Sequence, residues 1–126
     1  MPSMTSGNTA AECLSSLVRA ILAGDALEAR AYARELCEQP LSDVPRPVMA
    51  EELELIVAAA VIELLADRLQ QSPPNWTEAV NGWYEPLYLV ASASRFPNLR
   101  HQCDLESPEP LRRRNLFAPG NYLSWV

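Results

Sequence analysis

Three consecutive arginines, Arg112 to Arg114, lie near the C-terminus of this chain and could bind an anionic group. Guanidinium groups form paired, charge-assisted hydrogen bonds with carboxylates and phosphates. An asparagine follows directly, and the aromatic side chains downstream belong to the types that carry much of the binding energy at protein interfaces. The sequence therefore predicts a partner-binding segment made of Arg112, Arg113, Arg114, Asn115, Tyr122 and Trp125.

The same arginines also have a structural interpretation. Ser107 before two prolines is typical of a capped start of a short helix, which would direct consecutive arginines to different sides. In this interpretation Arg112 or Arg113 pairs with Glu106, Glu109 or a helix C-terminus and fixes the tail to the domain. The sequence leaves both interpretations open.

The other reactive side chains form no recognisable catalytic or metal centre. His101, the single histidine, and Cys103 could act as base and nucleophile, but residues two apart on a helix do not face each other. Glu51, Glu52 and Glu54 suit the positive end of a helix dipole better than a cation site, because no second ligand cluster accompanies them. We expect no catalytic residue, no metal and no cofactor; an enzyme would need an unrecognised site.

Composition limits the class of protein. The chain has 126 residues with 48% apolar content, which is enough for one domain with its own core. Its formal net charge is −6 and all ten basic residues are arginines, so binding to nucleic acid through a broad basic face is not expected. The longest apolar run, residues 55 to 62, is too short to span a membrane. Three cysteines without paired spacing, and no signal-peptide pattern, predict a reduced, cytoplasmic protein.

The sequence predicts that the chain is mainly helical. Thr9-x-x-Glu12 resembles a capping box, and apolar residues at helical spacing follow it as far as Gly24. Asp25 can cap a second helix that runs to Pro40. The short junction at residues 24 and 25 predicts an antiparallel helical hairpin.

A third helix is expected from Val48 to about Gln71, because this stretch has no glycine or proline. This prediction makes it the longest helix. Its centre is apolar around most of the circumference, so we expect it in the middle of the bundle, with a homodimer through this helix as the alternative.

The second half of the chain has a different character, since most of the aromatic residues and prolines lie after residue 72. Short helices are predicted at 75–80 and 97–104, with an irregular segment at 83–88 between them. Together these patterns predict an all-α fold. We expect a lead-in at 1–8 without stable structure and a single helical domain at 9–126, divided into a three-helix core (9–71) and an aromatic, proline-rich capping region and tail (72–126).

Residues 74 to 123 also carry a resemblance to known proteins. Pro74-x-Trp76-Thr77, then Pro86-x-Tyr88, and then Ser107-Pro108-x-x-x-Arg112-Arg113-x-x-Leu116-Phe117 are similar to segments of small, largely uncharacterised bacterial proteins that end in an S-P-x-x-x-R-R-x-x-[IL]-[FY] signature. Some of those proteins look like antitoxins and are encoded beside nucleotidyltransferase-like toxins. The resemblance implies a partner protein, such as a toxin-like enzyme, which this chain would bind and neutralise.

Three functions therefore follow as hypotheses. The first is a non-enzymatic, antitoxin-like protein–protein interaction module. The second is a nucleic-acid-associated accessory protein that uses Arg112 to Arg114, which would bind in a strongly salt-dependent way. The third is an enzyme whose site includes His101 or Cys103 with perturbed acidity.

Overall fold

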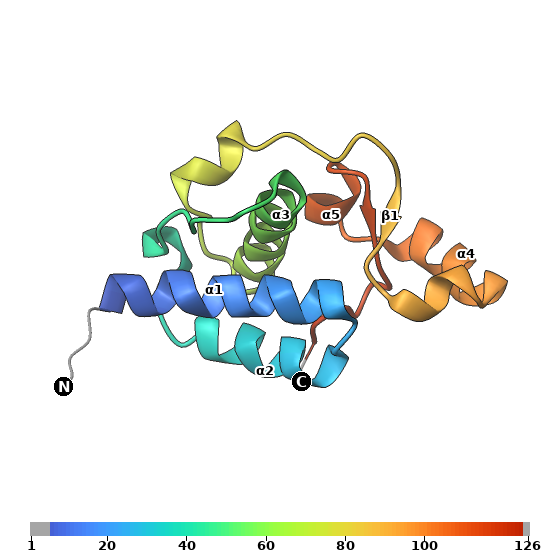
Figure 1. Ribbon diagram of the computed structural model, residues 1–126, viewed down its shortest axis with the longest axis horizontal. Coiled ribbons are helices and arrows are strands. Elements are labelled where there is room, and N and C mark those ends of the chain that lie inside the picture. Colours follow the sequence, from blue (N-terminus) through green and yellow to red (C-terminus); the bar gives the residue numbers. More distant parts are fainter. Residues whose placement is uncertain (1–5, 125–126) are drawn as a thin grey trace.

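The computed structural model describes residues 6–124, and these residues are mostly helical (Figure 1). The α-helices are α1 (Ser6–Ala23), α2 (Ala26–Leu36), α3 (Glu52–Arg68), α4 (Pro97–Glu106) and α5 (Glu109–Arg112). Two short strands, β1 (Leu87–Tyr88) and β2 (Leu116–Phe117), pair in parallel. Short 3₁₀ turns occur at Leu41–Asp43, Asn75–Ala79 and Ala91–Ser94. The all-α class expected from the sequence therefore holds at this coarse level.

Helices α1 and α2 form the antiparallel hairpin that the sequence predicts. Gly24 has a φ of 79°, which a glycine adopts without steric cost and which reverses the chain after α1. The Asp25 side chain accepts a hydrogen bond of 3.0 Å from the backbone N–H of Glu28 and so caps α2. Helix α1 begins at Ser6, inside the expected lead-in, so Thr9 lies within the helix and does not start it.

Helix α3 is shorter than its apolar pattern predicts. The Glu54 side chain accepts a hydrogen bond of 3.1 Å from the backbone N–H of the cap residue Glu51, so the helix starts at Glu52, four residues after Val48. At the other end Gln70 has a φ of 57°, which stops the helix before Gln71. The prediction that the third helix is the longest is wrong, because α1 has 18 residues and α3 has 17.

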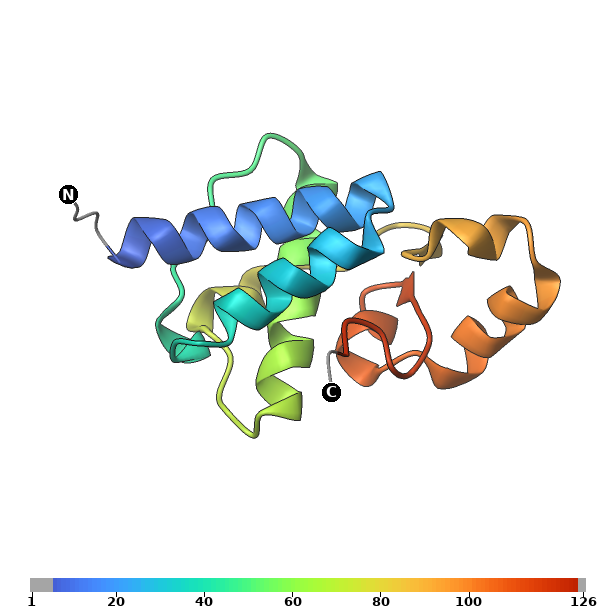
Figure 2. The same cartoon turned by 90° about the horizontal axis from the view of Figure 1, so that it is seen from below.

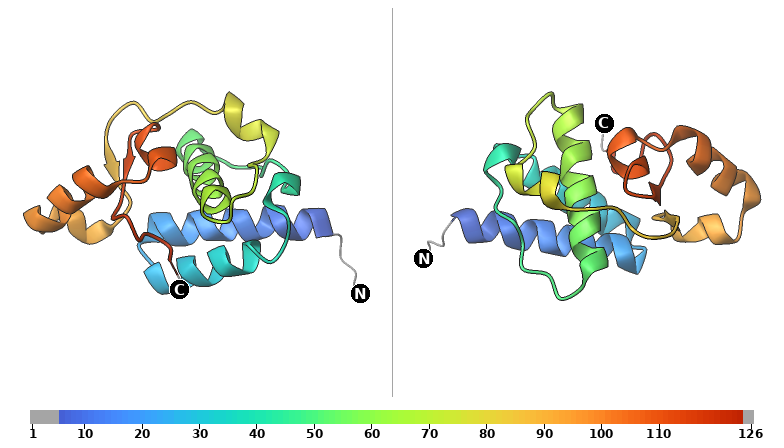
Figure 3. Two further views of the ribbon diagram at one scale, coloured as in Figure 1. Left: turned by 180° about the vertical axis from the view of Figure 1, so that it is seen from behind. Right: turned by 90° about the horizontal axis from the view of Figure 1, so that it is seen from above.

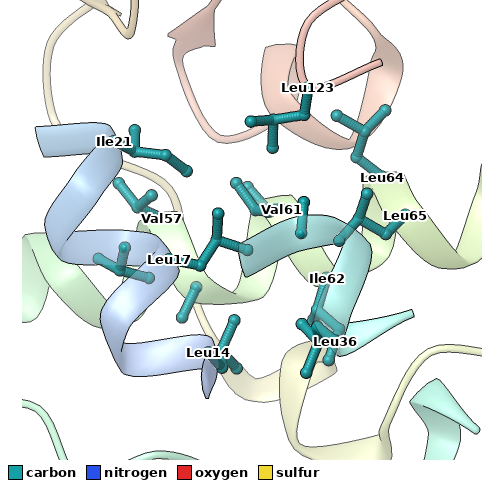
Figure 4. Close-up of a cluster of buried hydrophobic side chains, with 14 of the residues drawn as sticks. Leu14, Leu17, Ile21, Leu36, Val57, Val61, Ile62, Leu64, Leu65 and Leu123 are labelled. Carbon is teal, nitrogen blue, oxygen red and sulfur yellow. The ribbon is translucent and has the colours of Figure 1, made fainter. Parts of the chain in front are cut away.

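Helix α3 lies above α1 in Figure 1, where it is seen nearly end-on, and the right view of Figure 3 shows that it crosses α1 steeply. Every residue from Ile56 to Ala66 is buried. Burial inside one chain therefore accounts for the apolar circumference of this helix without a second copy. Figure 4 shows side chains of all three helices meeting in one cluster, with Leu123 of the tail reaching the same cluster.

The C-terminal region lies beside the hairpin as a second group of elements (Figure 2). It does not only cover the core but contributes fully buried side chains to it, among them Leu111, Leu116 and Ala118. Among the aromatic residues, Trp76 and Trp83 pack partly buried against the core, whereas Tyr84 is 78% exposed. The core thus draws on the tail as well as on residues 9–71.

Two local predictions for this region need correction. The segment 83–88 is not wholly irregular, because β1 pairs with β2 through Leu87↔Leu116 and Tyr88↔Phe117. Ser107 does not cap α5 with its side chain. Its hydroxyl instead accepts a hydrogen bond of 2.9 Å from the N–H of Ala118 and donates one of 3.3 Å to the carbonyl of Leu116. The serine therefore joins α4 to the segment after β2.

Candidate functional site

The three consecutive arginines of the tail point to three different environments. Arg112 is the last residue of α5, and its guanidinium reaches the end of α4, where it donates hydrogen bonds of 3.2 Å to the carbonyls of Asp104 and Leu105. A cation is favoured there, because the last carbonyls of a helix carry the negative end of its dipole. Arg112 thus anchors α5 to α4, and neither Glu106 nor Glu109 takes part in this contact.

Arg114 is buried, with 5% of its surface exposed. Its guanidinium forms a two-point ion pair with the carboxylate of Glu63, in which Nη2 lies 3.1 Å from Oε2. Nη2 also donates to the carbonyl of Thr77 at 2.9 Å. Glu63 itself is only 5% exposed and lies in the apolar middle of α3. The pair therefore ties α5 to α3 and to the turn at residues 75–79.

Arg113 shares the same carboxylate but lies at the surface. Its Nη2 pairs with Glu63 Oε1, while half of its side chain remains exposed. The Arg113–Glu63–Arg114 cluster therefore contains two positive charges and one negative charge, a net charge of +1. The unbalanced charge lies on the exposed member, where an incoming anion can reach it.

The acidity of Glu63 reflects this arrangement. Burial by itself would raise the pKa of Glu63, but the hydrogen bonds from Arg114 and Arg113 outweigh burial, and the pKa falls below its usual value of 4.5. Glu63 was not among the residues singled out from the sequence. The one signal for it is a single charge inside the otherwise apolar stretch from 55 to 66.

The pH dependence of stability should reveal this carboxylate. Because folding lowers the Glu63 pKa, its stabilising contribution is complete above the unfolded value and disappears as the pH falls through the folded value. The stability difference between wild type and Glu63→Gln should therefore be constant from pH 7 down to about 5 and should shrink steadily as the pH falls below about 4.5. Urea unfolding of both proteins across this range measures the difference. A difference that stays constant to pH 2.5 would contradict the ion pair.

Asn115 holds the segment before β1 against the tail. It has a φ of 67°, a left-handed conformation that asparagine tolerates better than most residues. Its side-chain amide donates to the carbonyl of Trp83 at 3.1 Å, and the N–H of Trp83 donates to the carbonyl of Arg114 at 2.9 Å. A side chain at Gly82 would lie 2.8 Å from the Arg114 Cα, so this close approach needs glycine. Asn115 is therefore engaged within the chain.

An exposed aromatic side chain stands beside this junction. Tyr84 follows Trp83 directly, and their ring centres lie 4.6 Å apart with a tilted geometry. Trp83 is partly buried against the core, so it supports the exposed Tyr84 ring from one side. Tyr84 was not predicted as a binding residue, although an aromatic pair in a segment rich in turns was the available signal.

Tyr122 and Trp125 are the two remaining residues of the predicted binding set. Tyr122 is partly buried, and its backbone carbonyl accepts a hydrogen bond from Arg68 at the end of α3. A second donor of Arg68 bonds the carbonyl of Gly120 at 3.1 Å, so α3 holds the tail at two points. Burial raises the pKa of Tyr122. Trp125 lies outside the described residues.

The residues of the enzyme hypothesis do not share a cleft. Cys103 is fully buried on α4 and burial raises its pKa, whereas His101 is exposed on the same helix. Cys13 lies between α1 and α2, with its Sγ 3.4 Å from Glu35 Oε2, and burial and Glu35 raise its pKa to about 12. A raised pKa keeps a thiol protonated and unreactive at neutral pH.

No group of three or more His, Cys, Asp and Glu side chains in the described part of the chain lies close enough together to hold a metal ion. Within residues 6–124, moreover, no helix has both the length and the apolar character needed to cross a membrane. The Glu51, Glu52 and Glu54 carboxylates lie at the start of α3, where the helix dipole favours them.

Comparison with known proteins found no matching family model, no matching curated protein and no matching solved structure.

Proposed function

We propose that this chain is a non-enzymatic protein-binding module that contacts an acidic surface of its partner through Arg113 and Tyr84. The observation that carries the proposal is the geometry of the Arg113–Glu63–Arg114 cluster. Arg114 already forms a two-point ion pair with Glu63, so Arg113 has a half-exposed guanidinium whose charge is not balanced within the cluster. A partner carboxylate would balance it.

The position of Arg113 is fixed before binding. Its guanidinium is held by Glu63, so binding costs less side-chain entropy than it would for a freely rotating arginine. The Trp83 N–H donates a hydrogen bond to the Arg114 carbonyl. Tyr84 follows Trp83 in the chain and Arg113 precedes Arg114, so this bond joins the two segments that carry them. Tyrosine and arginine are the types that dominate interface energetics, and here both come from segments joined by backbone hydrogen bonds.

In this proposal Arg112, Arg114, Asn115 and Tyr122, the other described members of the predicted binding set, have a structural role. Arg112, Arg114 and Asn115 each have partners within the chain, and Tyr122 is partly buried. Neutralisation of a toxin-like enzyme is the form of this function that the sequence resemblance implies. The nucleic-acid alternative is less favoured, because the chain has a net charge of −6 and all three of its clustered arginines make contacts within the chain.

The experiment compares binding of the wild type, Arg113→Gln and Tyr84→Ala. Partners are isolated by cross-linking the tagged protein in its native host, and the affinity of the purified partner is measured by calorimetry. Each substitution should weaken binding about 30-fold, the size of a hot-spot loss of ~2 kcal/mol. Arg19→Gln, which replaces an exposed arginine on α1, is the control and should leave the affinity unchanged.

Circular dichroism and urea unfolding establish that all four proteins are folded. Affinities of Arg113→Gln and Tyr84→Ala equal to that of wild type would contradict the proposed surface. Recovery of nucleic acid in place of protein, with an affinity that falls steeply with salt, would favour the accessory-protein alternative.

A further inference from the structure

A cavity of about 300 Å³ lies where the end of the α1–α2 hairpin meets the tail. Three parts of the chain form it: the hairpin turn with the first turns of α2, the segment after β1, and residues 119–124. This cavity is not lined by Arg113, Glu63, Arg114 or Tyr84. It is therefore separate from the surface proposed above.

The floor of the cavity is apolar and belongs to the core. Ile21, Leu89 and Leu123 are 4–6% exposed and are members of the buried cluster, so packing fixes their positions. Ala26 and Ala29 of α2 also line the space, and their small side chains leave it open. Preformed apolar cavities of this size are at the lower end of the range for small-molecule sites.

Polar groups are few and lie among these apolar walls. Arg30 lines the cavity from α2, is exposed, and has no ion-pair or hydrogen-bond partner among residues 6–124. The Tyr122 side chain also lines the cavity, and its hydroxyl has no hydrogen-bond partner within the described chain. The carboxylate at this end, Asp25, is engaged as the cap of α2. Within residues 6–124, Arg30 is thus an unpaired cation next to an apolar space.

We propose that this cavity binds a small molecule with an apolar body and a carboxylate. The apolar body, about the size of one or two fused rings, would pack against Ile21, Leu89 and Leu123. The carboxylate would form a charge-assisted hydrogen bond with Arg30. The Tyr122 hydroxyl supplies a further donor. The few polar groups would thus orient the ligand, and burial of its apolar surface would supply most of the affinity.

The first test is titration of the full chain with 1-naphthylacetate and with 2-(1-naphthyl)ethanol, which has the same ring system but no charge. Amide resonances in ¹H–¹⁵N spectra should shift saturably at Ala29, Leu89 and Leu123. The carboxylate should bind about tenfold more tightly than the alcohol, the gain expected for a hydrogen bond to a charged group. Equal affinities would overturn the assignment of a carboxylate ligand, and shifts elsewhere on the protein would overturn the site.

The second test uses paired substitutions on exposed positions of α2. Ala26→Leu should fill the cavity and weaken 1-naphthylacetate binding at least tenfold, whereas Ala31→Leu, outside this cavity, should not. Arg30→Gln should remove the preference for the carboxylate over the alcohol, and Arg34→Gln should leave it intact. All four positions are exposed, so the variants should fold like wild type. Binding that survives Ala26→Leu unchanged would contradict the proposal.

Discussion

Replacing Glu63 by methionine is expected to lower the free energy of unfolding by about 3–5 kcal/mol, the usual cost of removing one partner of a buried ion pair. The substitution keeps the approximate size of the side chain but leaves the buried Arg114 guanidinium with the carbonyl of Thr77 as its single partner. An arginine cannot release its proton to escape burial. Urea unfolding followed by circular dichroism at pH 7 measures the loss.

A double-mutant cycle tests the mechanism of that loss. Because Glu63→Met together with Arg114→Met removes both buried charges, the double variant should be more stable than Glu63→Met alone. Glu78→Met, at an exposed position in the turn at residues 75–79, serves as the control and should change stability by less than about 0.5 kcal/mol. Additive losses in the double variant would show that Glu63 and Arg114 do not stabilise the fold as a pair.

Truncating Leu111 to alanine should cost about 2–5 kcal/mol, since its fully buried side chain would leave a cavity between α5 and α3. Because Leu111 is part of the core, the tail and the helices of this variant should still unfold together, in one cooperative transition at a lower temperature. Leu105→Ala is the matched control, because Leu105 lies on α4 with 66% of its surface exposed. Its expected effect is below about 0.5 kcal/mol.

Thermal unfolding recorded by far-ultraviolet circular dichroism and by tryptophan fluorescence distinguishes the two outcomes. A single shared transition that shifts down in Leu111→Ala indicates that the tail is part of the core. A separate early transition, or equal effects of Leu111→Ala and Leu105→Ala, would mean that the tail is only a cover over an independent helical core.

Because the three arginines have different partners, they should be substituted one at a time. A triple Arg112, Arg113 and Arg114 substitution would remove a helix anchor and a buried ion pair together with any binding group. Loss of a partner in that variant could then follow from unfolding alone. Arg113 is the one member of the three whose replacement leaves both anchoring contacts in place.

Local signals predicted the helical hairpin and the position of α4, but not the ends of α1 and α3. Gly24 and Asp25 predicted the hairpin because a left-handed turn and a side-chain cap depend on neighbouring residues alone. The same local logic placed α4, which begins at Pro97. The start of α3 was misplaced because helix propensity does not distinguish Val48 from Glu51, whereas the cap made with Glu54 does.

The helical class, the α1–α2 hairpin and the arginine-rich tail could thus be predicted from the sequence, because they depend on residues close together in the chain. Folding brings Glu63 to two of the arginines, about fifty residues away, and pairs β1 with β2. It also forms the cavity beside Arg30, between the hairpin and the tail. Such contacts depend on how packing brings distant segments together, and neither periodicity nor local spacing contains that information.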